Sequence, residues 1–248
     1  MSARHPCARS SRKVKFITLR GRGDHDHSGC SHADLLAHVR SVEPGSEKQV
    51  GSYLKILNER YRMVERLQPV FARPNARNGR FYIRDNFLRS WLGALAVPVA
   101  STSFRPVDTL VASADARLQG VEGHGLERLV ATLYEERSRK GVGDFPLTEA
   151  TRGWWDRSDT ELDLVAQDSE RKVLRLGTCK RSADRLIRDL GQFEGHVGRF
   201  LAHSGRFAGW SIEKVAIAPT LDPEQRQACV RAGCLPQDLR DLTDGLLP

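Results

Sequence analysis

The segment "TELDLVAQDSERKVLRLGTCK" (residues 160–180) decides the expected fold. Its two halves are rich in apolar and β-branched residues and are separated by a charged turn, a pattern that predicts two neighbouring strands. The first strand carries Glu161 and Asp163, which are expected to share one face because alternate residues of a strand point the same way. The second strand ends on the polar triplet Thr178-Cys179-Lys180.

The elements around this segment predict a sheet covered by helices. An amphipathic helix is expected over 121–141 and an extended stretch over 145–156. The two strands follow, and then a long helix over 182–205. The β-branched strand "IEKVAIA" and the helix "PEQRQACVRAG" complete the order α-β-β-β-α-β-α. A helical crossover between strands implies a mixed sheet flanked by helices, so the expected fold class is α+β.

The first third of the chain predicts a different, smaller module. A helix is expected over 32–42 with Ser31 as its N-cap, and Pro44-Gly45 then breaks the chain. A second helix is expected over 47–61, in which Val50, Leu54, Leu57 and Tyr61 fall on one apolar face. Extended stretches on both sides of the turn "ARPNARNG" predict a β-hairpin.

This order is typical of a winged helix-turn-helix, whose second helix enters a major groove while the hairpin lies on phosphates. The residues expected to face the groove are Lys48, Ser52 and Lys55, and those expected on the wing are Arg73, Arg77 and Arg80. The alternative is a winged helix that docks proteins and binds no nucleic acid.

Charge favours the nucleic acid. The chain of 248 residues has a net charge of +8. Residues 1–92 hold 18 Lys and Arg against 8 Asp and Glu, whereas residues 93–248 hold 21 against 23. Such asymmetry indicates two modules, a basic one that faces a polyanion and a neutral one joined to it. The alternative is a basic surface that only aids solubility.

The expected boundaries follow from these patterns. Residues 1–30 are predicted to form a disordered basic arm, 31–85 the winged helix, 86–119 a helical linker that begins at the capping residue Asp85, and 120–248 the sheet domain. Five scattered cysteines without a CxxC pair suggest reduced thiols in the cytoplasm. No apolar run of 18 residues and no secretory signal are found, so no membrane partner is expected.

Five pieces of the sequence, in order, resemble a known family. They are "RFYIRDNFLRSW" (80–91), Glu127, "GWWDR" (153–157), "ELDLVA" (161–166) and "CK" (179–180). Together they resemble the PD-(D/E)xK nuclease superfamily, and more closely the C-terminal half of the archaeal-type P-loop ATPases, in which a winged helix precedes a nuclease-like domain. The resemblance covers residues 31–248.

The resemblance assigns roles to single residues. It implies that Asp163 is a metal ligand, that Cys179 offers its carbonyl, that Lys180 is the catalytic lysine and that Glu127 is the helical acid, with Mg²⁺ as the cofactor of an active site. The chain departs from the pattern at Thr178, where the family has Glu, and a neutral hydroxyl is a poor ligand for a small dication. Glu161 could help such an ion through a water molecule.

Two hypotheses therefore stand. The first is a DNA-binding protein with a nuclease-like domain whose metal site is impaired, and the second is an active Mg²⁺-dependent DNA endonuclease. No GxxxxGK[ST] motif occurs, so no ATP binding is expected. DNA is the expected partner, and a P-loop ATPase or another protein is a further expected partner. The sequence leaves both alternatives for the chain itself: a genuine short protein, or a truncated form of a longer ATPase.

Overall fold

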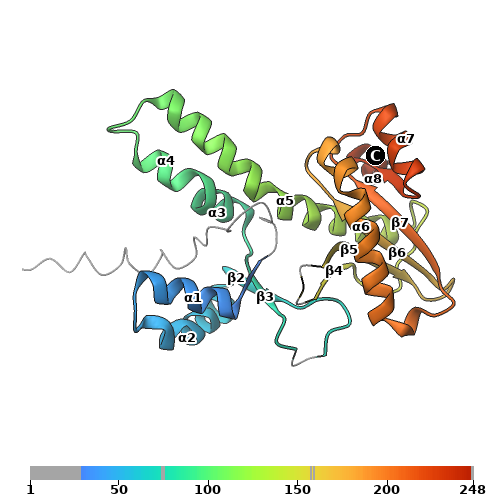
Figure 1. The fold of residues 1–248 in the computed structure, drawn as a ribbon, viewed down its shortest axis with the longest axis horizontal. Coiled ribbons are helices and arrows are strands. Elements are labelled where there is room, and N and C mark those ends of the chain that lie inside the picture. The colour runs from blue at the N-terminus through green and yellow to red at the C-terminus, as the bar shows by residue number, and fades with distance from the viewer. Residues whose placement is uncertain (1–28, 74–75, 157, 159, 247–248) are drawn as a thin grey trace, which may run out of the picture. The chain divides into compact units, whose positions relative to one another are not determined.

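The computed structural model describes residues 29–73, 76–156, 158 and 160–246, which divide into two units (Figure 1). The first unit is Met1–Leu67 with Gly79–Glu122, and the second is Gln68–Asn78 with Gly123–Pro248. The predicted boundaries at 85 and 119 differ from this division, because the chain enters the second unit once between two strands of the first. Of the arm predicted over 1–30, residues 1–28 lie outside the described residues, whereas Cys30 begins a strand and so does not belong to a disordered arm.

The first unit contains a small antiparallel sheet. Its strands are β1 (Cys30–Ser31), β2 (Val64–Leu67) and β3 (Arg80–Ile83), in the order β1-β3-β2. The hairpin predicted from the two extended stretches is therefore confirmed. The helix α1 (His32–Val42) follows β1 directly, and Ser31 caps it in a reciprocal box with Asp34, as the sequence predicted.

The second predicted helix is irregular. It consists of a 3₁₀ turn η2 (Ser46–Gln49), the helix α2 (Val50–Lys55) and a π-helical turn η3 (Ile56–Arg60). Val50 packs against Leu35 and Val39 of α1 in the core of this unit. Tyr61, however, is 57% exposed, so its prediction on the apolar face was wrong. The π turn adds residues to one turn and shifts the positions beyond it around the helix axis.

The helices that follow cross the predicted boundary between the linker and the sheet domain. Asp85 caps α3 (Asn86–Ser90), which continues through a π-helical turn η4 (Trp91–Leu95) into α4 (Ala96–Ala100). The helix α5 (Val107–Lys140) then runs without a break from the predicted linker into the helix expected over 121–141, and the boundary between the units falls within it. No helix in the described part of the chain combines the length and apolar character needed to cross a membrane.

The second unit is built on a five-stranded mixed sheet. Its strands are β4 (Arg152–Trp155), β5 (Glu161–Asp168), β6 (Val173–Cys179), β7 (Ser211–Ile217) and β8 (Leu235–Gln237). They lie in this order, antiparallel from β4 to β6 and parallel from β6 to β8. The helices α6 (Ala183–His203), α7 (Pro223–Arg231) and α8 (Leu239–Thr243) follow β6, β7 and β8. The α+β class and the predicted order of elements are confirmed, with β8 and α8 added.

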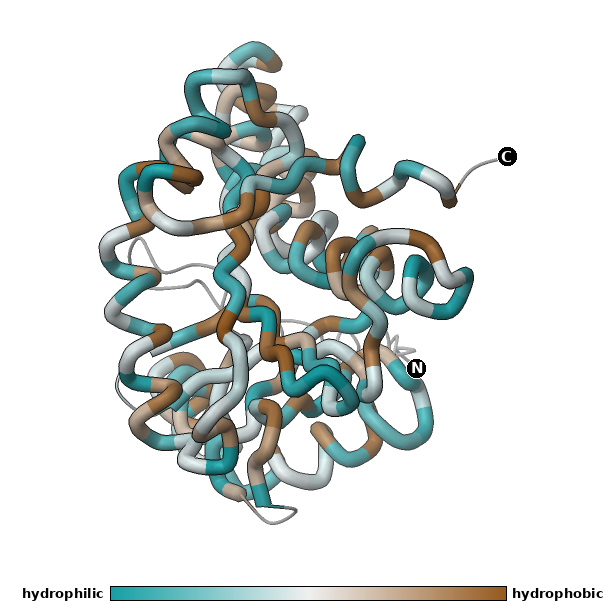
Figure 2. Tube along the Cα trace, turned by 90° about the vertical axis from the view of Figure 1, so that its right-hand side faces the viewer, coloured by the Kyte–Doolittle hydropathy of each residue, from teal (hydrophilic) through white to brown (hydrophobic). Residues whose placement is uncertain are grey.

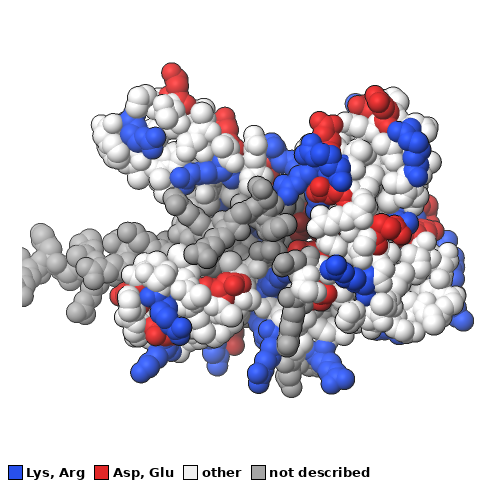
Figure 3. Space-filling model, in the orientation of Figure 1, with Lys and Arg blue, Asp and Glu red and all other residues white. Residues whose placement is uncertain are grey.

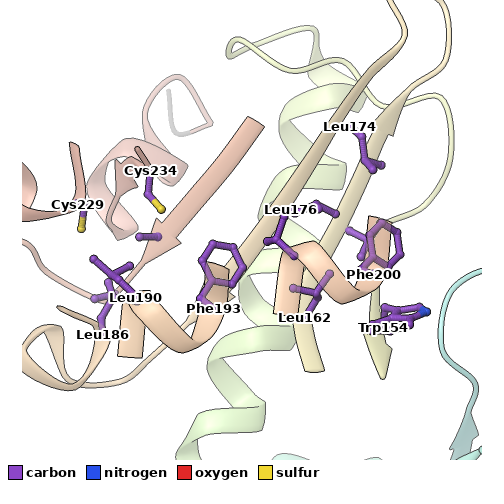
Figure 4. Close-up of a cluster of buried hydrophobic side chains, with 14 of the residues drawn as sticks. Trp154, Leu162, Leu174, Leu176, Leu186, Leu190, Phe193, Phe200, Cys229 and Cys234 are labelled. Atoms are coloured by element: carbon purple, nitrogen blue, oxygen red, sulfur yellow. The ribbon is translucent and has the colours of Figure 1, made fainter. Parts of the chain in front are cut away.

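Two apolar clusters cover the two faces of this sheet. On one face α6 buries Leu186, Leu190, Phe193, Val197 and Phe200 against strand residues that include Leu174 and Leu176 (Figure 4). On the other face Val130 and Tyr134 of α5 pack against Val215 and Ile217. Colouring by hydropathy shows hydrophobic and hydrophilic residues alternating along the helices, as expected for helices with one buried side (Figure 2).

The strand β5 contains an irregularity beside its polar residues. Arg152 pairs with Val165, whereas Trp154 pairs with Leu162, so β5 has one residue more than β4 over this stretch. As a result Leu162 and Leu164, two apart, pack into the clusters on opposite faces. Asp163 lies between them, at the extra residue. Such bulges re-aim a side chain and are frequent next to functional sites.

Candidate functional site

The carboxylate of Asp163 meets the end of β6. Its Oδ2 atom accepts hydrogen bonds from the Cys179 amide at 2.7 Å and from the Thr178 hydroxyl at 3.2 Å. The ammonium of Lys180 lies 3.6 Å from the same oxygen. The side chains of Asp163 and Lys180 are 9% and 22% exposed, so this ion pair is largely shielded from water. The structure thus brings Asp163, Thr178, Cys179 and Lys180 into one cluster.

The electrostatics of the cluster act on the pKa values of Lys180 and Cys179. The negative charge of Asp163 raises the pKa of Lys180, with a smaller contribution from Glu127 that acts in the same direction against the opposing effect of burial. Lys180 is therefore a charged hydrogen-bond donor and not a general base near neutral pH. Burial raises the pKa of the Cys179 thiol well above its usual value, so this sulfur is neutral and no nucleophile.

Glu127 lies on α5, and its Oε2 is 3.2 Å from Nδ1 of His124, one helical turn earlier. Its charge acts on both Lys180 and Cys179, which places Glu127 near the cluster. Glu161 begins β5 opposite Trp155, and its backbone carbonyl accepts a hydrogen bond of 2.8 Å from Nδ1 of His196 on α6. Sequence reasoning did not single out either histidine.

The residues of this cluster do not fit a magnesium ion. Within the described ranges, no group of three or more His, Cys, Asp and Glu side chains is arranged to hold a metal. Asp163 offers one carboxylate that already faces three donors, and Thr178 offers a neutral hydroxyl. Small dications prefer several hard oxygen ligands, and carboxylates above all. The donor set is that of a hydrogen-bonded ion pair.

The six residues expected to contact nucleic acid are divided between the units. Lys48, Ser52 and Lys55 are exposed on η2 and α2, where positive and negative side chains are intermingled over the visible face of α1 and α2 (Figure 3). Arg80 begins β3 and is half-buried. Arg73 and Arg77 are exposed, but they lie in the segment 68–78, which belongs to the second unit. The structure therefore does not place the three arginines on one wing of the first unit.

A pocket in the second unit was missed by the sequence analysis. It has a volume of about 460 Å³ and is lined by residues 69–72 and 78, by 154–156 at the end of the strand β4, and by 203–206 at the end of α6. The Val70 amide donates to the Gly153 carbonyl at 2.9 Å, and the Trp155 indole donates to the Asn78 carbonyl at 2.7 Å. The apolar run "QPVF" inside a stretch that otherwise reads as a turn was the signal that could have indicated this packing.

Comparison of the chain with protein-family models, with curated proteins and with solved structures gave no match. The resemblance to nuclease-like domains thus stays a prediction that rests on the residues quoted for it and on the geometry of the Asp163 cluster.

Proposed function

We propose that this chain is a nucleic-acid-binding protein that joins a winged helix to a PD-(D/E)xK-like domain whose metal site is impaired. The observation that carries the proposal is the contact of one Asp163 oxygen with the hydroxyl of Thr178, the amide of Cys179 and the ammonium of Lys180. These residues come from the strands on which the family resemblance places the catalytic acid and lysine. Two hydrogen bonds and an ion pair occupy the carboxylate oxygen that an active enzyme would offer to a cation.

The chemistry explains why one residue decides between the hypotheses. Metal-dependent hydrolysis of a phosphodiester needs a bound dication that polarises the phosphate and activates water. Thr178 stands where a second strand carboxylate would be required, and it supplies no charge. The proximity of Lys180 to Asp163 favours the second candidate, an active endonuclease, because the family resemblance assigns this acid and this lysine to catalytically active metal sites.

Nucleic-acid binding is supported by the first unit. It carries the basic excess of the chain, and it has two helical segments beside a three-stranded antiparallel sheet, as winged helices do. Lys48 and Lys55 are exposed on the second helical segment. Two long cations on one exposed surface suit the phosphates that flank a major groove. DNA is the proposed partner, and a P-loop ATPase remains a proposed protein partner on the family resemblance alone.

The test is the salt dependence of duplex DNA binding by the full chain. Fluorescence anisotropy should show binding whose logarithmic affinity falls with the logarithm of salt concentration. Lys48→Ala/Lys55→Ala should weaken this binding and reduce the slope by about 0.9 for each phosphate that the protein no longer neutralises. Arg231→Ala/Arg240→Ala, at exposed positions of α7 and α8, removes the same charge and is the matched control. A chain that binds no duplex at low salt, or binds it unchanged in the double variant, refutes this assignment.

A further inference from the structure

The helix α6 carries a basic stripe on its solvent side. Residues three or four apart share one side of a helix, and about 100° of rotation separates successive residues. The stripe so defined contains three arginines, a histidine and no acid, and its members are Arg185, Arg188, Gln192, Gly195, Arg199 and His203. All of them are exposed except Arg185, which is half-buried. The buried side chains of α6 lie on the other side, toward the sheet.

The acidic residues of α6 flank the stripe and contact other groups. Glu194 pairs with Lys214 at 2.5 Å, and Asp189 lies 3.6 Å from Arg185. Asp184 accepts a hydrogen bond from Gln225 at 3.2 Å. Their negative charge is therefore partly offset within the unit. Because Asp189 in turn offsets Arg185, the positive potential of the stripe rests on Arg188 and Arg199.

The two ends of the stripe lead to two distinct features. At its start, α6 follows β6 after only Lys180, Arg181 and the capping Ser182, so the stripe begins beside the Asp163 cluster. At its end, His203 and the following Ser204-Gly205-Arg206 line the 460 Å³ pocket. A helix of 21 residues is about 31 Å long at 1.5 Å per residue. One continuous surface thus joins the cluster to the pocket.

The pocket is suited to a flat, polar ring. Trp154 and Trp155 form part of its wall, and the Arg206 guanidinium lies 4.3 Å from the centre of the Phe71 ring, a second part of the wall. Among the described residues no donor meets Oδ1 of Asn78, a lining residue, but this oxygen is buried and is not accessible from the pocket. Its one acidic wall residue, Asp156, already accepts from the Ser158 amide at 2.7 Å and the Ser158 hydroxyl at 2.9 Å.

From this arrangement we propose that the second unit binds single-stranded nucleic acid along α6, with phosphates on Arg188 and Arg199 and a base in the pocket beside Arg206. The inference rests on the proposed nucleic-acid function but assigns a second site, separate from Lys48 and Lys55. A basic track that ends at a pocket with an exposed guanidinium plane, on which a base can stack, suits single strands, in which bases are free to leave the stack. Duplex DNA cannot place a base in a pocket without unpairing it.

The experiment measures binding of fluorescent deoxythymidine decamers to the full chain, a length within the range of about 4 to 16 nucleotides that such tracks occupy. Arg188→Ala/Gln192→Glu is expected to weaken binding about tenfold, and Arg206→Ala about fivefold or more, on the scale of a stacking or phosphate contact. Gln192→Glu is also measured alone. Gly198→Glu is its matched control: it adds the same single negative charge to α6, at an exposed position about 100° from the centre of the stripe. It should change affinity less than twofold.

The outcomes separate this inference from the proposed function. Loss of decamer binding in the α6 variants, with duplex binding retained, supports it. Wild-type decamer affinity in those variants overturns it, as does an equal loss in Gly198→Glu or in Lys48→Ala/Lys55→Ala. If the α6 inference is overturned, the proposed function still stands as long as duplex affinity depends on salt and falls in Lys48→Ala/Lys55→Ala. Circular dichroism of each variant verifies folding, and Gln192→Glu alone, which preserves side-chain size, serves if the double variant unfolds.

Discussion

The hydroxyl of Thr178 and the carboxylate of Asp163 lie 3.2 Å apart on neighbouring strands, joined by a hydrogen bond. This hydrogen bond shows that the side chain at position 178 faces Asp163 of β5. From the sequence, this orientation was implied only by the family resemblance. A carboxylate at this position would stand beside Asp163 and Lys180. The position of Thr178 therefore gives a direct test of the impaired-site proposal.

We predict that Thr178→Glu raises the affinity for Mn²⁺ at least about tenfold, because a second carboxylate supplies the hard anionic ligand that a dication needs. Without metal the variant should be less stable than the wild type, since two like charges then share a shielded site, and Mn²⁺ should restore the loss. Calorimetric titration and thermal unfolding with and without Mn²⁺ measure both effects.

Asp163→Ala in the Thr178→Glu background is the control and should abolish the gain. Unchanged Mn²⁺ affinity in Thr178→Glu would show that this position does not serve a metal. Mn²⁺-dependent cleavage of plasmid DNA by the wild type, abolished in Lys180→Ala, would instead establish the endonuclease.

Gly177 tests the packing of the strand that carries the cluster. A methyl group at this position would lie 3.0 Å from Cβ of Leu164 and 2.9 Å from Cγ1 of Val215, closer than carbon atoms normally approach. Gly177→Ala should therefore destabilise the second unit by about 1–3 kcal/mol, the range for overpacked cores. Gly191→Ala on α6 is the control. Its added methyl meets nothing within 4 Å, so it should stabilise the helix by about 0.5–1 kcal/mol. Chemical denaturation measures both, and equal stabilities would contradict the packing.

Local sequence signals predicted the helices and strands, because the contacts that start or stabilise these elements join residues close together in the sequence. Ser31 and Asp85 bond to amides three residues ahead, so their caps can be read from a few positions. The apolar strands β5, β6 and β7 were recognised from composition for the same reason. The Asp163 cluster was found because its polar residues stand at fixed places along two such strands.

Features that depend on distant contacts were not predictable. The segment 68–78 has turn-forming composition, and only its packing on β4 shows that Val70 and Phe71 belong to the second unit. The π turn before Tyr61 shifts the helical positions, and the bulge at Asp163 shifts the pairing of β5 with β4. No local sequence pattern indicates either inserted residue. Arg73 and Arg77 were assigned to a wing because the strands around them pair, whereas the loop between paired strands is free to pack elsewhere.

We predict that Tyr134 makes the free energy of unfolding decrease at high pH. Burial raises its pKa to about 12, and its hydroxyl donates to Oε1 of Gln237 at 2.5 Å. The fold thus favours the protonated form, so this contribution to stability is complete below about pH 10, the ordinary value, and is lost as pH rises toward 12. Tyr134→Phe should lose about 1 kcal/mol at neutral pH through the missing hydrogen bond, yet its stability should fall less between about pH 10 and 12.

Urea unfolding at several pH values measures this dependence. Tyr61→Phe, at an exposed position, should show the alkaline loss of the wild type. A Tyr134→Phe protein whose stability falls as steeply as that of the wild type above about pH 10 would mean that another group controls the alkaline transition.

The segment 68–78 should be part of the folding unit of the second sheet. The ring of Phe71 lies 5.3 Å from Phe207 and 6.4 Å from Phe200, and Val70 joins the same cluster. A fragment of residues 103–248 lacks this segment and exposes the aromatic surface that it covers. Because apolar surface contributes about 25 cal/mol for each Å² buried, the fragment should melt at a lower temperature than the second unit within the full chain. Tryptophan fluorescence follows the transition, since Trp154 and Trp155 lie beside the segment.

Single substitutions in the full chain separate the packing of this segment from other effects of truncation. Phe71→Ala should reproduce part of the destabilisation, about 1–3 kcal/mol for a half-buried ring, because it removes the aromatic surface that the segment places on the sheet domain. Phe87→Ala, whose ring is 73% exposed on α3, is the control and should change stability little. A fragment as stable as the full chain, together with a neutral Phe71→Ala, would show that the segment merely rests on a sheet domain that folds without it.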